Sequence, residues 1–534
     1  MIVRFDVFKI FVLLFLGIFY LSLSVSAQDV VKEYPVKYNA DKSSVFKVSV
    51  NGREIFTEDY KDVHYVNFGF AGKAEITVTV SEKVNKAEIS PRRFEIRPEV
   101  KGDQISFTIE KPSKLVAYIN NLERLFIFAD GIENESPEPG DENIVSIEKY
   151  SVDNTGKTLS TSSIQKAIDE CATFNKILFF PAGVYLIGTL NLRTNSNIYL
   201  EYGAVLLGSP DRKDYPQDAG FNEADQVNDP DNYTNKGWKM TYSRLILIGE
   251  AENVKLWGRG IIDGQGAKLR PQGKPANLIR VRNSKNILVK GLLLRDPAAW
   301  NTHILASDGV TFQDIKMIND RNVFNTDGID PDGSRNVTVD NCFMYCSDDN
   351  IAIKTSGNTE LLQPAENILV KNCVFITKKS AMKLGTETRA DIRNVTFDNN
   401  SILECDRGMS LYSRDGSVFE NIHFTNNHFE RLFEDNQQRI LQFELGDRAV
   451  DDAPGYVRRA GQIKNVLIEN CVYDYKGNKE SNIDGFDENH KISGVQFKNL
   501  IIQGTLCKDL KDAWIKINKF TEDVTFEVTE QKNN

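Results

Sequence analysis

The sequence predicts an all-β protein, in which a right-handed parallel β-helix (a solenoid) follows an N-terminal antiparallel β-sandwich. Two observations support this prediction. Residues 34–130 alternate apolar and polar side chains with a period of two, and Gly, Pro and Asn turns separate the short runs. Beyond residue 250 a phrase recurs in which Asn precedes alternating aliphatic and polar residues and a second Asn. Repeats of about 20–50 residues made of short strands indicate a solenoid.

The first residues have the pattern of a secretory signal peptide. Basic residues precede an apolar run from Ile10 to Val25, and the small residues Ser26 and Ala27 end it. The run is short for a membrane-spanning helix. We therefore expect residues 1–27 to be cleaved off and the protein to be secreted or periplasmic, with no membrane span after cleavage.

Composition excludes several classes of function. The chain of 534 residues has 65 Lys and Arg against 75 Asp and Glu, a formal net charge of −10, whereas a nucleic-acid-binding surface is basic. The 5 His argue against a histidine-rich metal centre, and the 7 Cys are too few and odd in number for a disulfide scaffold. We expect a monomer with a polysaccharide or oligosaccharide substrate, and no nucleic-acid partner, cofactor or metal.

The sandwich is assigned to residues 28–132. Alternating runs at 74–80 and 105–109 are typical of half-buried strands. No cluster of reactive side chains occurs there, so this part is interpreted as a supporting or carbohydrate-contacting module. Residues 133–143 are acidic, contain Pro and lack an apolar period, which is typical of a linker. The β-helix is expected over residues 144–534.

One helical pattern, at 162–172, precedes the repeats. The recurring phrase starts at residues 286, 309, 336, 367, 394 and 421, so the intervals are 23, 27, 31, 27 and 27 residues, and it returns at 465. Coils of a β-helix stack at about 4.8 Å, so the repeated Asn is expected to form a side-chain ladder at a turn. Cys342, Cys373 and Cys471 share one position of the phrase and are expected to be stacked, buried thiols.

A second register places polar side chains on successive coils. If Ile329, Ile351, Met382 and Met409 are core positions, the alternate side chains face solvent together. The first exposed column would hold Asp330, Ala352, Lys383 and Ser410, and the second Asp332, Lys354, Gly385 and Tyr412.

Three carboxylates are expected to converge on this face. Asp348 and Asp349 follow Asp327 by 21 and 22 residues, about one coil. Close carboxylates repel, which raises the pKa of one of them, and a protonated acid beside ionised neighbours is what glycosidic cleavage needs. Each Asp alone is typical of a turn or a calcium site, but the one-coil spacing favours the catalytic interpretation.

The motif around these carboxylates, Asn325-Thr326-Asp327-Gly328-Ile329-Asp330 followed by Asp348-Asp349, resembles family 28 of the glycoside hydrolases, the polygalacturonase family. It also resembles the related dextranase and isopullulanase family, in which a β-sandwich precedes the β-helix. The resemblance implies hydrolysis of a polysaccharide with inversion at the anomeric carbon. It further implies that Asp348 is the general acid, and that Asp327 and Asp349 position and activate the water.

The substrate-binding positions depart from that family. Ser380 stands where the family has the His of Gly-His-Gly, and Ser410-Leu411-Tyr412 replaces the Arg-Ile-Lys that grips a uronate carboxylate. Either Lys383, Arg407 or Arg414 supplies this clamp, or the sugar is neutral and Tyr412 stacks on it. The candidate substrate-binding residues are Asp330, Lys354, Lys383, Arg407, Tyr412, Arg414 and His303.

Two other classes of function remain open. In a calcium-dependent β-helix polysaccharide lyase, the Asp cluster would hold calcium and Lys383 would abstract a proton. A non-catalytic glycan-binding β-helix gives no reason for three carboxylates at one-coil spacing. Glu387 and Arg389, in a predicted loop after Lys383, are expected to form an exposed ion pair.

Overall fold

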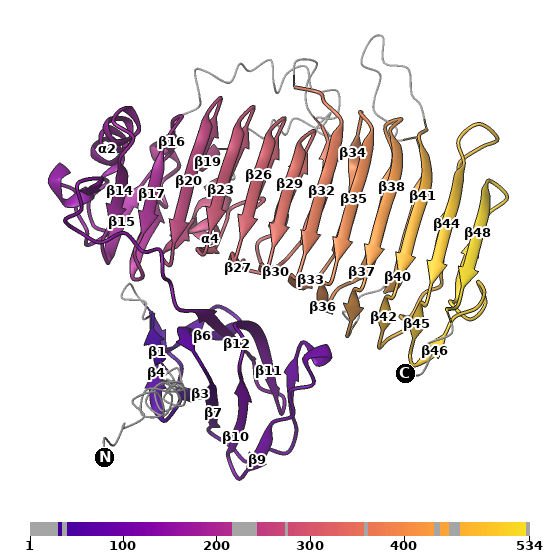
Figure 1. The fold of residues 1–534 in the computed structure, drawn as a ribbon, viewed down its shortest axis with the longest axis horizontal. Coiled ribbons are helices and arrows are strands. Elements are labelled where there is room, and N and C mark those ends of the chain that lie inside the picture. The colour runs from indigo at the N-terminus through magenta and orange to yellow at the C-terminus, as the bar shows by residue number, and fades with distance from the viewer. Residues whose placement is uncertain are drawn as a thin grey trace, which may run out of the picture.

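The computed structural model describes residues 30–34, 40–215, 243–272, 276–356, 361–431, 438–447 and 460–529. The predicted leader, and much of the segments 211–238 and 433–459, lie outside these ranges. Within them, no helix is both long enough and apolar enough to span a membrane. Figure 1 shows a row of stacked coils with a smaller β-sandwich beside it.

The N-terminal part forms two sheets that pack face to face. The first sheet has the order β2-β5-β6-β12-β11-β8 with β1 beside β6, and the second has the order β4-β3-β7-β10-β9. The bounds are β1 Val30–Glu33, β2 Asp41–Lys42, β3 Phe46–Val50, β4 Arg53–Ile55, β5 Thr57–Tyr60, β6 Val63–Ala71, β7 Ala74–Val80, β8 Ala87–Ser90, β9 Glu99–Lys101, β10 Gln104–Ile109, β11 Ser113–Ile119 and β12 Arg124–Gly131. The predicted sandwich is confirmed, except that β6 and β12 run parallel rather than antiparallel.

The rest of the chain winds through three sheets, and one strand from each makes a coil. Neighbouring strands are parallel except β45 and β46, the last pair of the 12-stranded sheet, which are antiparallel. The 13-stranded sheet contains β13 Ile144–Ser146, β14 Ile177–Phe180, β17 Asn197–Leu200, β20 Glu252–Gly258, β23 Lys285–Lys290, β26 Asp308–Gln313, β29 Arg335–Asp340, β32 Ala365–Lys371, β35 Ile392–Asp398, β38 Val418–Thr425, β41 Gln462–Glu469, β44 Ile492–Lys498 and β48 Thr521–Glu527.

The 12-stranded sheet contains β15 Gly183–Ile187, β18 Ala204–Gly208, β21 Ile261–Asp263, β24 Leu293–Arg295, β27 Lys316–Ile318, β30 Phe343–Cys346, β33 Val374–Thr377, β36 Ser401–Glu404, β39 His428–Phe429, β42 Val472–Tyr473, β45 Ile501–Ile502 and β46 Thr505–Leu506. The 11-stranded sheet contains β16 Leu190–Leu192, β19 Ser243–Gly249, β22 Ala276–Arg282, β25 Thr302–Leu305, β28 Ile329–Asp332, β31 Ile351–Thr355, β34 Ser380–Thr388, β37 Arg407–Ser413, β40 Arg439–Leu445, β43 Ser481–Asp484 and β47 Ile515–Ile517.

Two asparagine ladders form the corners of the coils. Asn336, Asn367, Asn394, Asn421 and Asn465 all have φ between 53° and 59°, the left-handed region that Asn tolerates better than most residues. Each amide donates to the previous one, for example Asn394 Nδ2 to Asn367 Oδ1 at 3.2 Å and Asn421 Nδ2 to Asn394 Oδ1 at 3.1 Å. The second ladder, at the other end of these strands, is mixed: Asn399 Nδ2 donates to Asn372 Oδ1 at 2.7 Å, whereas Asn372 and Asn426 donate to Asp340 and Asp398. The predicted Asn register is therefore confirmed.

The cysteines behave as predicted. Cys342, Cys373 and Cys471 are buried free thiols. The Cys342 amide donates to Cys373 Sγ at 3.4 Å, and Asn400 and Asn427 continue this column toward Cys471. Cys342 and Cys373 are therefore stacked on successive coils, whereas Asn400 and Asn427 take this position on the two coils before Cys471.

Helix α2 (Thr161–Thr173) lies over the first coil, where a helix was predicted. Its buried side chains, Ile164, Ala167, Ile168, Cys171 and Ala172, join the solenoid core, which otherwise would present an open apolar end. The described part contains one further α-helix, the short α4 (Gly266–Leu269), and four 3-10 helices, Arg92–Phe94, Ile147–Tyr150, Arg212–Asp214 and Arg270–Gln272.

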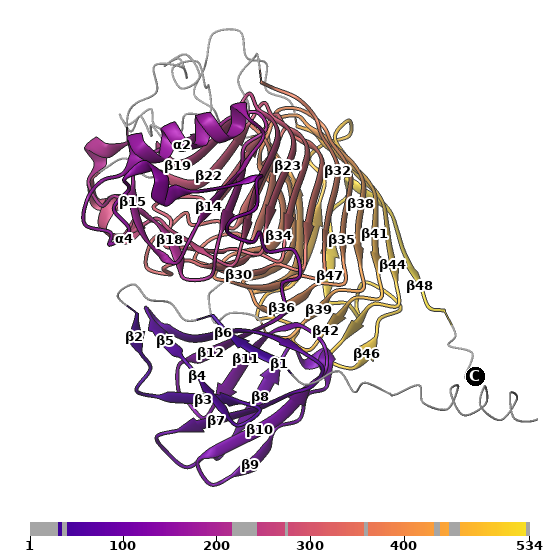
Figure 2. The ribbon, with the colours of Figure 1, turned by 60° about the vertical axis from the view of Figure 1, so that its left-hand side comes forward.

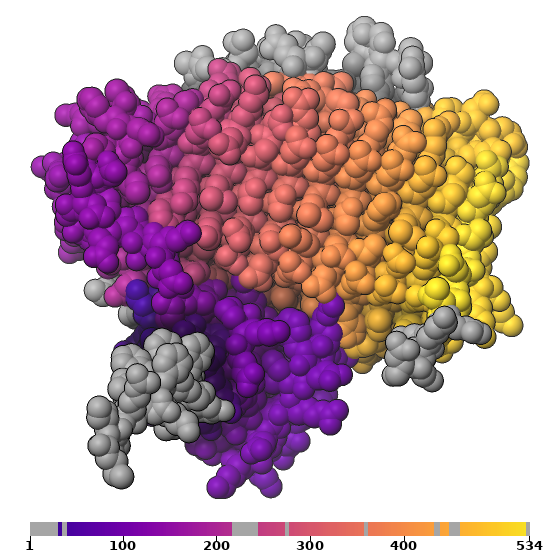
Figure 3. All heavy atoms as spheres, viewed as in Figure 1, coloured from indigo at the N-terminus to yellow at the C-terminus, as the bar shows by residue number. Residues whose placement is uncertain are grey.

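The sandwich packs on the 12-stranded sheet of the solenoid (Figures 2 and 3). Phe126 and Phe128 on β12 contact Phe343 on β30, with ring centroids 4.8 and 5.0 Å apart. These residues belong to one apolar cluster shared by the two parts. Burial of large aromatic rings dominates the energy of such contacts, so the sandwich and the solenoid are expected to fold as one body.

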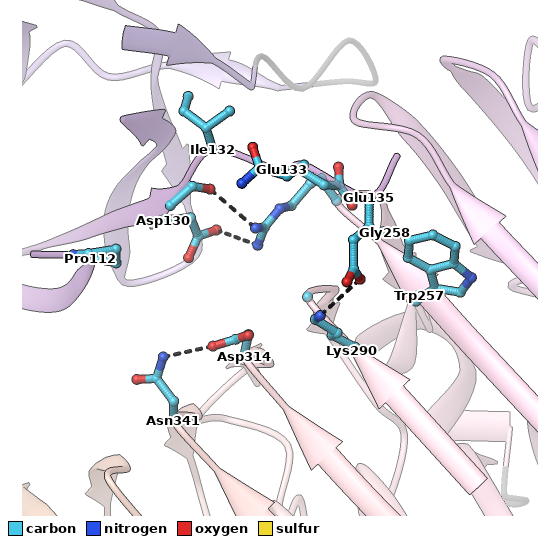
Figure 4. A pocket seen from close by; sticks show the side chains of 14 residues that line it. Pro112, Asp130, Ile132, Glu133, Glu135, Trp257, Gly258, Lys290, Asp314 and Asn341 are labelled. Atoms are coloured by element: carbon cyan, nitrogen blue, oxygen red, sulfur yellow. Dashed lines mark hydrogen bonds and ion pairs between the residues drawn. The ribbon is translucent and has the colours of Figure 1, made fainter. Parts of the chain in front are cut away.

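Buried ion pairs surround this apolar contact. Arg295 of β24 lies between Glu58 of the sandwich at 2.8 Å and Asp263 of the solenoid at 2.7 Å, and all three side chains are buried. Beside the linker, a cavity of about 380 Å³ separates the two parts. Figure 4 shows Glu135 facing Lys290 across it, at 3.5 Å.

Replacement of Asn394 tests the corner geometry. Asn394→Ala keeps a β-carbon at φ 54° and loses both ladder hydrogen bonds, so the free energy of unfolding should fall by about 1–2 kcal/mol. Asn394→Gly also loses the bonds but relieves the strain, as Gly309 and Gly494 do at the same point of other coils. Denaturant unfolding should rank the wild type first, Gly second and Ala last, and a more stable Ala variant would refute this account.

Candidate active site

Strand pairing in the 11-stranded sheet confirms the predicted register. Ile329 pairs with Ile351, Ile351 with Met382, and Met382 with Met409. Lys383 therefore stands beside Ser410, as predicted. The exception is Gly385, because the register shifts after Ile353 and no pairing places Gly385 beside Lys354.

The expectation that these columns are exposed is wrong. Asp330, Ala352 and Ser410 are fully buried although they point away from the core, and Lys354 is nearly so. The reason is that charged and aromatic side chains pack over them. Lys354 Nζ lies 4.0 Å from the ring centroid of Trp300.

The three predicted carboxylates do come together. Asp327, Asp348 and Asp349 each offer an oxygen, and these oxygens lie within 4.8 Å of one another. Backbone pairing between coils brings them there, since the amide of Gly328 donates to the carbonyl of Asp349 at 2.9 Å. Asp327 and Asp349 are buried, whereas Asp348 is partly exposed.

Two lysines compensate this negative charge. Lys383 Nζ donates to Asp349 Oδ2 at 2.7 Å, and the amide of Ser380 donates to Asp349 Oδ1 at 2.9 Å. Lys354 Nζ lies 3.9 Å from Asp327 and 3.4 Å from Asp330. Lys383 is thus the counter-ion of Asp349, and Lys354 is the counter-ion of Asp327 and Asp330.

The three carboxyl groups titrate differently. Burial, followed by repulsion from Asp349, raises the pKa of Asp348. Burial and the neighbouring carboxylates raise the pKa of Asp327 well above its usual range. Burial also opposes ionisation of Asp349, but Lys383 outweighs it and lowers the pKa of Asp349. The cluster therefore combines a partly exposed carboxyl group, Asp348, whose pKa is raised with a carboxylate, Asp349, whose pKa is lowered, and this separation suits proton transfer in both directions.

His303 and Asp332 form a buried pair beside this cluster. His303 Nε2 lies 2.9 Å from Asp332 Oδ2, and Ser356 also bonds this carboxylate. Burial lowers the pKa of His303. His303 was predicted to bind substrate, but its Nε2 atom already forms a hydrogen bond within the protein.

Tyr412 and Arg414 have partners within the solenoid. The Tyr412 hydroxyl donates to Gln442 Oε1 at 2.8 Å, and its ring is nearly buried. Arg414 forms an ion pair with Glu444. Arg407 lies nearer the carboxylate cluster, and its charge contributes to lowering the pKa of Asp349.

Two residues of the site were misplaced or given no role from the sequence. Glu387 lies on β34 rather than in a loop, and its carboxylate is 3.5 Å from Lys354 Nζ. Trp300 covers Lys354, which no periodicity indicated.

Two protein-family models match this chain, and one of them covers the part that contains the carboxylate cluster. The family model described as "Glycosyl hydrolases family 28" matches residues 226–510, more than half of the chain. A second, "Rhamnogalacturonase A/epimerase, pectate lyase-like", matches residues 144–287.

Curated relatives include two bacterial enzymes. An exo-poly-alpha-D-galacturonosidase of Dickeya chrysanthemi is 26% identical over 414 residues, which cover 66% of this chain and 68% of that protein. An endo-polygalacturonase of Pectobacterium carotovorum subsp. carotovorum is 29% identical over 283 residues, covering 48% of this chain and 64% of that protein. The chain thus spans about two thirds of these relatives.

Solved structures share the fold. A family 28 exopolygalacturonase of Yersinia enterocolitica aligns with a TM-score of 0.57 at 17% identity, over 94% of this chain and 96% of that one. Dex49A from Penicillium minioluteum aligns with a TM-score of 0.52 at 11% identity, over 93% and 96%. At these identities the likeness shows the fold alone.

Replacement of Lys354 tests the charge balance of the cluster. Burial raises the pKa of Asp330 to about 7, although Lys354 lowers it. Because this exceeds the value of about 4 in an unfolded chain, the stability that Asp330 contributes is present below about pH 4 and is lost as the pH rises through about 7. Lys354→Met removes the cation and should destabilise the fold by about 3–5 kcal/mol at pH 8, and by less than half of that at pH 5, where Asp330 is protonated.

Denaturant unfolding at the two pH values measures this difference. Lys285→Met, which removes an exposed lysine on the 13-stranded sheet, is the control and should cost little at either pH. Equal destabilisation by Lys354→Met at pH 5 and pH 8 would contradict the charge account.

Proposed function

Because the chain belongs to family 28 of the glycosyl hydrolases, we propose that it hydrolyses the O-glycosidic bonds of a galacturonide polysaccharide with the Asp327, Asp348 and Asp349 carboxylates. The observation that carries this proposal is their convergence within 4.8 Å, with the pKa of Asp348 raised and that of Asp349 lowered. The printed names of the curated relatives, galacturonosidase and polygalacturonase, supply the substrate class.

In the proposed reaction Asp348 donates its proton to the oxygen of the leaving sugar as the bond from that oxygen to the anomeric carbon breaks. A water attacks the anomeric carbon and passes its proton to Asp349, the ionised carboxylate. Asp327 orients this water. Asp327 and Asp349 were both expected to position and activate the water, but the raised pKa of Asp327 favours Asp349 as the group that takes the proton.

Inversion at the anomeric carbon is proposed from the family resemblance. The separation within the cluster, below 4.8 Å, is shorter than the roughly 6.5–9.5 Å that is usual between the carboxyl groups of inverting enzymes. Spacing alone therefore does not indicate inversion. Proton NMR of the first product formed from an α-galacturonide decides the point, because inversion releases the β anomer first.

A polysaccharide lyase is the second candidate, since three carboxylate oxygens within 4.8 Å could also hold a cation. The amines of Lys354 and Lys383 already supply positive charge to the cluster. Less negative charge is then left to hold a calcium ion, and this favours hydrolysis over the lyase reaction. A lyase would yield an unsaturated, ultraviolet-absorbing product and lose activity in a chelator. We propose a saturated product and no effect of the chelator.

The export predicted from the leader would place the enzyme outside the cytoplasm, where a polymer too large to be taken up is accessible. Ser380 and Ser410-Leu411-Tyr412, which replace the family's histidine and Arg-Ile-Lys, imply altered subsites. Dextranase-like action on a neutral glycan is the alternative, and side-by-side assays on oligogalacturonate and dextran distinguish the two.

Asp348→Asn should abolish the general acid while keeping the shape of the side chain. We expect kcat on oligogalacturonate to fall by about 10²–10⁴-fold with KM little changed. Asp141→Asn, in the exposed linker, is the matched control and should keep full activity. Normal turnover by Asp348→Asn would refute the assignment of the acid.

Lys383→Met should shift the pH profile. Lys383 lowers the pKa of Asp349, so its removal raises that pKa, and a higher pH is then needed to ionise the base. The acidic limb of kcat/KM should move up by about one to three pH units, whereas Lys383→Arg should keep it close to the wild-type position. An unmoved limb in Lys383→Met would show that Asp349 is not the base.

A further inference from the structure

Two arginines continue the column that contains the carboxylates. Ser380 pairs with Arg407, and Arg407 pairs with Arg439 on the next coil. Asp327 and Asp349 precede Ile329 and Ile351 by two residues, as Ser380 precedes Met382, so all of them occupy one position of the coil. At about 4.8 Å per coil, Arg407 and Arg439 lie roughly 10 and 14 Å along the axis from Asp349.

Neither arginine is fully satisfied by the protein. The Nε atoms of Arg407 and Arg439 are buried and have no hydrogen-bond partner. Arg407 Nη2 is 3.5 Å from Asp406, and Arg439 Nη1 donates to Asn482 Oδ1 at 2.5 Å. Within the described residues, no carboxylate lies at salt-bridge distance from Arg439. Two neighbouring cations that are partly buried repel each other and lose hydration, so their free energy falls when an anion joins them.

Three other cations of this face have carboxylate partners. Lys383 donates to Asp349, Lys354 lies among Asp330, Asp327 and Glu387, and Arg414 pairs with Glu444. The places of the family's clamp hold the uncharged Ser410 and Tyr412. Arg407, on the same strand as these positions, and Arg439, on the next coil, place positive charge beside them.

We infer that Arg407 and Arg439 form a carboxylate-binding subsite that selects a uronic acid on the C-terminal side of the carboxylate cluster. This inference rests on the proposed function and identifies the source of its substrate specificity. A planar carboxylate accepts paired hydrogen bonds from guanidinium groups. A neutral sugar would leave both charges unpaired, and a site built for a polar group discriminates strongly against a ligand that lacks it.

The experiment compares oligogalacturonate with the same oligomer after reduction of its carboxyl groups. Arg407→Gln and Arg439→Gln should each raise KM for oligogalacturonate about tenfold or more, as expected for a lost hydrogen bond to a charged group. Arg439→Gln should leave kcat within a few-fold, whereas Arg407→Gln should also move the acidic limb of the pH profile upward, because Arg407 helps to lower the pKa of Asp349. The wild type should turn over the reduced oligomer poorly, and the variants should not worsen this. Arg335→Gln, an exposed arginine of the 13-stranded sheet, is the control with equal loss of charge.

A binding measurement separates specificity from turnover and from folding. In an Asp348→Asn background, calorimetric titration should show that trigalacturonate binds and that Arg439→Gln weakens it at least tenfold, with the thermal midpoint of each variant checked. Arg439→Lys, which keeps the charge without the planar fork, should fall between. Unchanged KM and binding in both Gln variants would overturn the inference and leave the proposed function standing. A wild type that cleaves only neutral glycans would overturn the proposed function itself.

Discussion

Hydrogen bonding between the backbones of neighbouring coils is the constraint on which every functional feature of this molecule depends. Residues 22 to 33 positions apart stand side by side only because each strand pairs with the next coil in a single register. A slip by one residue would turn Met382 outward and Lys383 inward. The asparagine corners oppose such a slip, because their left-handed backbone and amide ladder fix where each strand begins. The solenoid thus brings together acidic residues that are far apart in the sequence.

Buried charges occur both in the site and in the interface between the sandwich and the solenoid. Arg295 lies between Glu58 and Asp263 beneath the sandwich, much as Lys354 lies among carboxylates in the site. Water is displaced from both places, so each charge depends on its immediate neighbours. In the site this dependence raises the pKa of Asp327 and Asp348 and lowers that of Asp349.

The repeats, the corners and the convergence of Asp327, Asp348 and Asp349 could be predicted from sequence, because a fixed period converts directly into position in a solenoid. Burial could not be predicted in the same way. Asp330 and Lys354 alternate as solvent-facing residues should, yet both are buried: Trp300 and Glu387 contact Lys354 from other coils, and Lys354 itself lies 3.4 Å from Asp330. The parallel pairing of β6 with β12 could not be predicted either, because alternation of apolar and polar residues indicates a strand but not the direction in which it runs. Arg439 was missed because the segment before it breaks the period.

The column Asp327, Asp349, Ser380, Arg407 and Arg439 has a consequence for how such an enzyme can change. Each of these side chains comes from a separate coil. The distance between the acidic and the basic side chains is therefore set only by the number of coils that separate them. Gain or loss of a whole coil would move the arginines relative to the acids by one coil while leaving the surroundings of each side chain almost intact. Selectivity for the length and charge pattern of a polymer is then a modular property of the scaffold, adjustable in steps of one coil and without redesign of the chemistry.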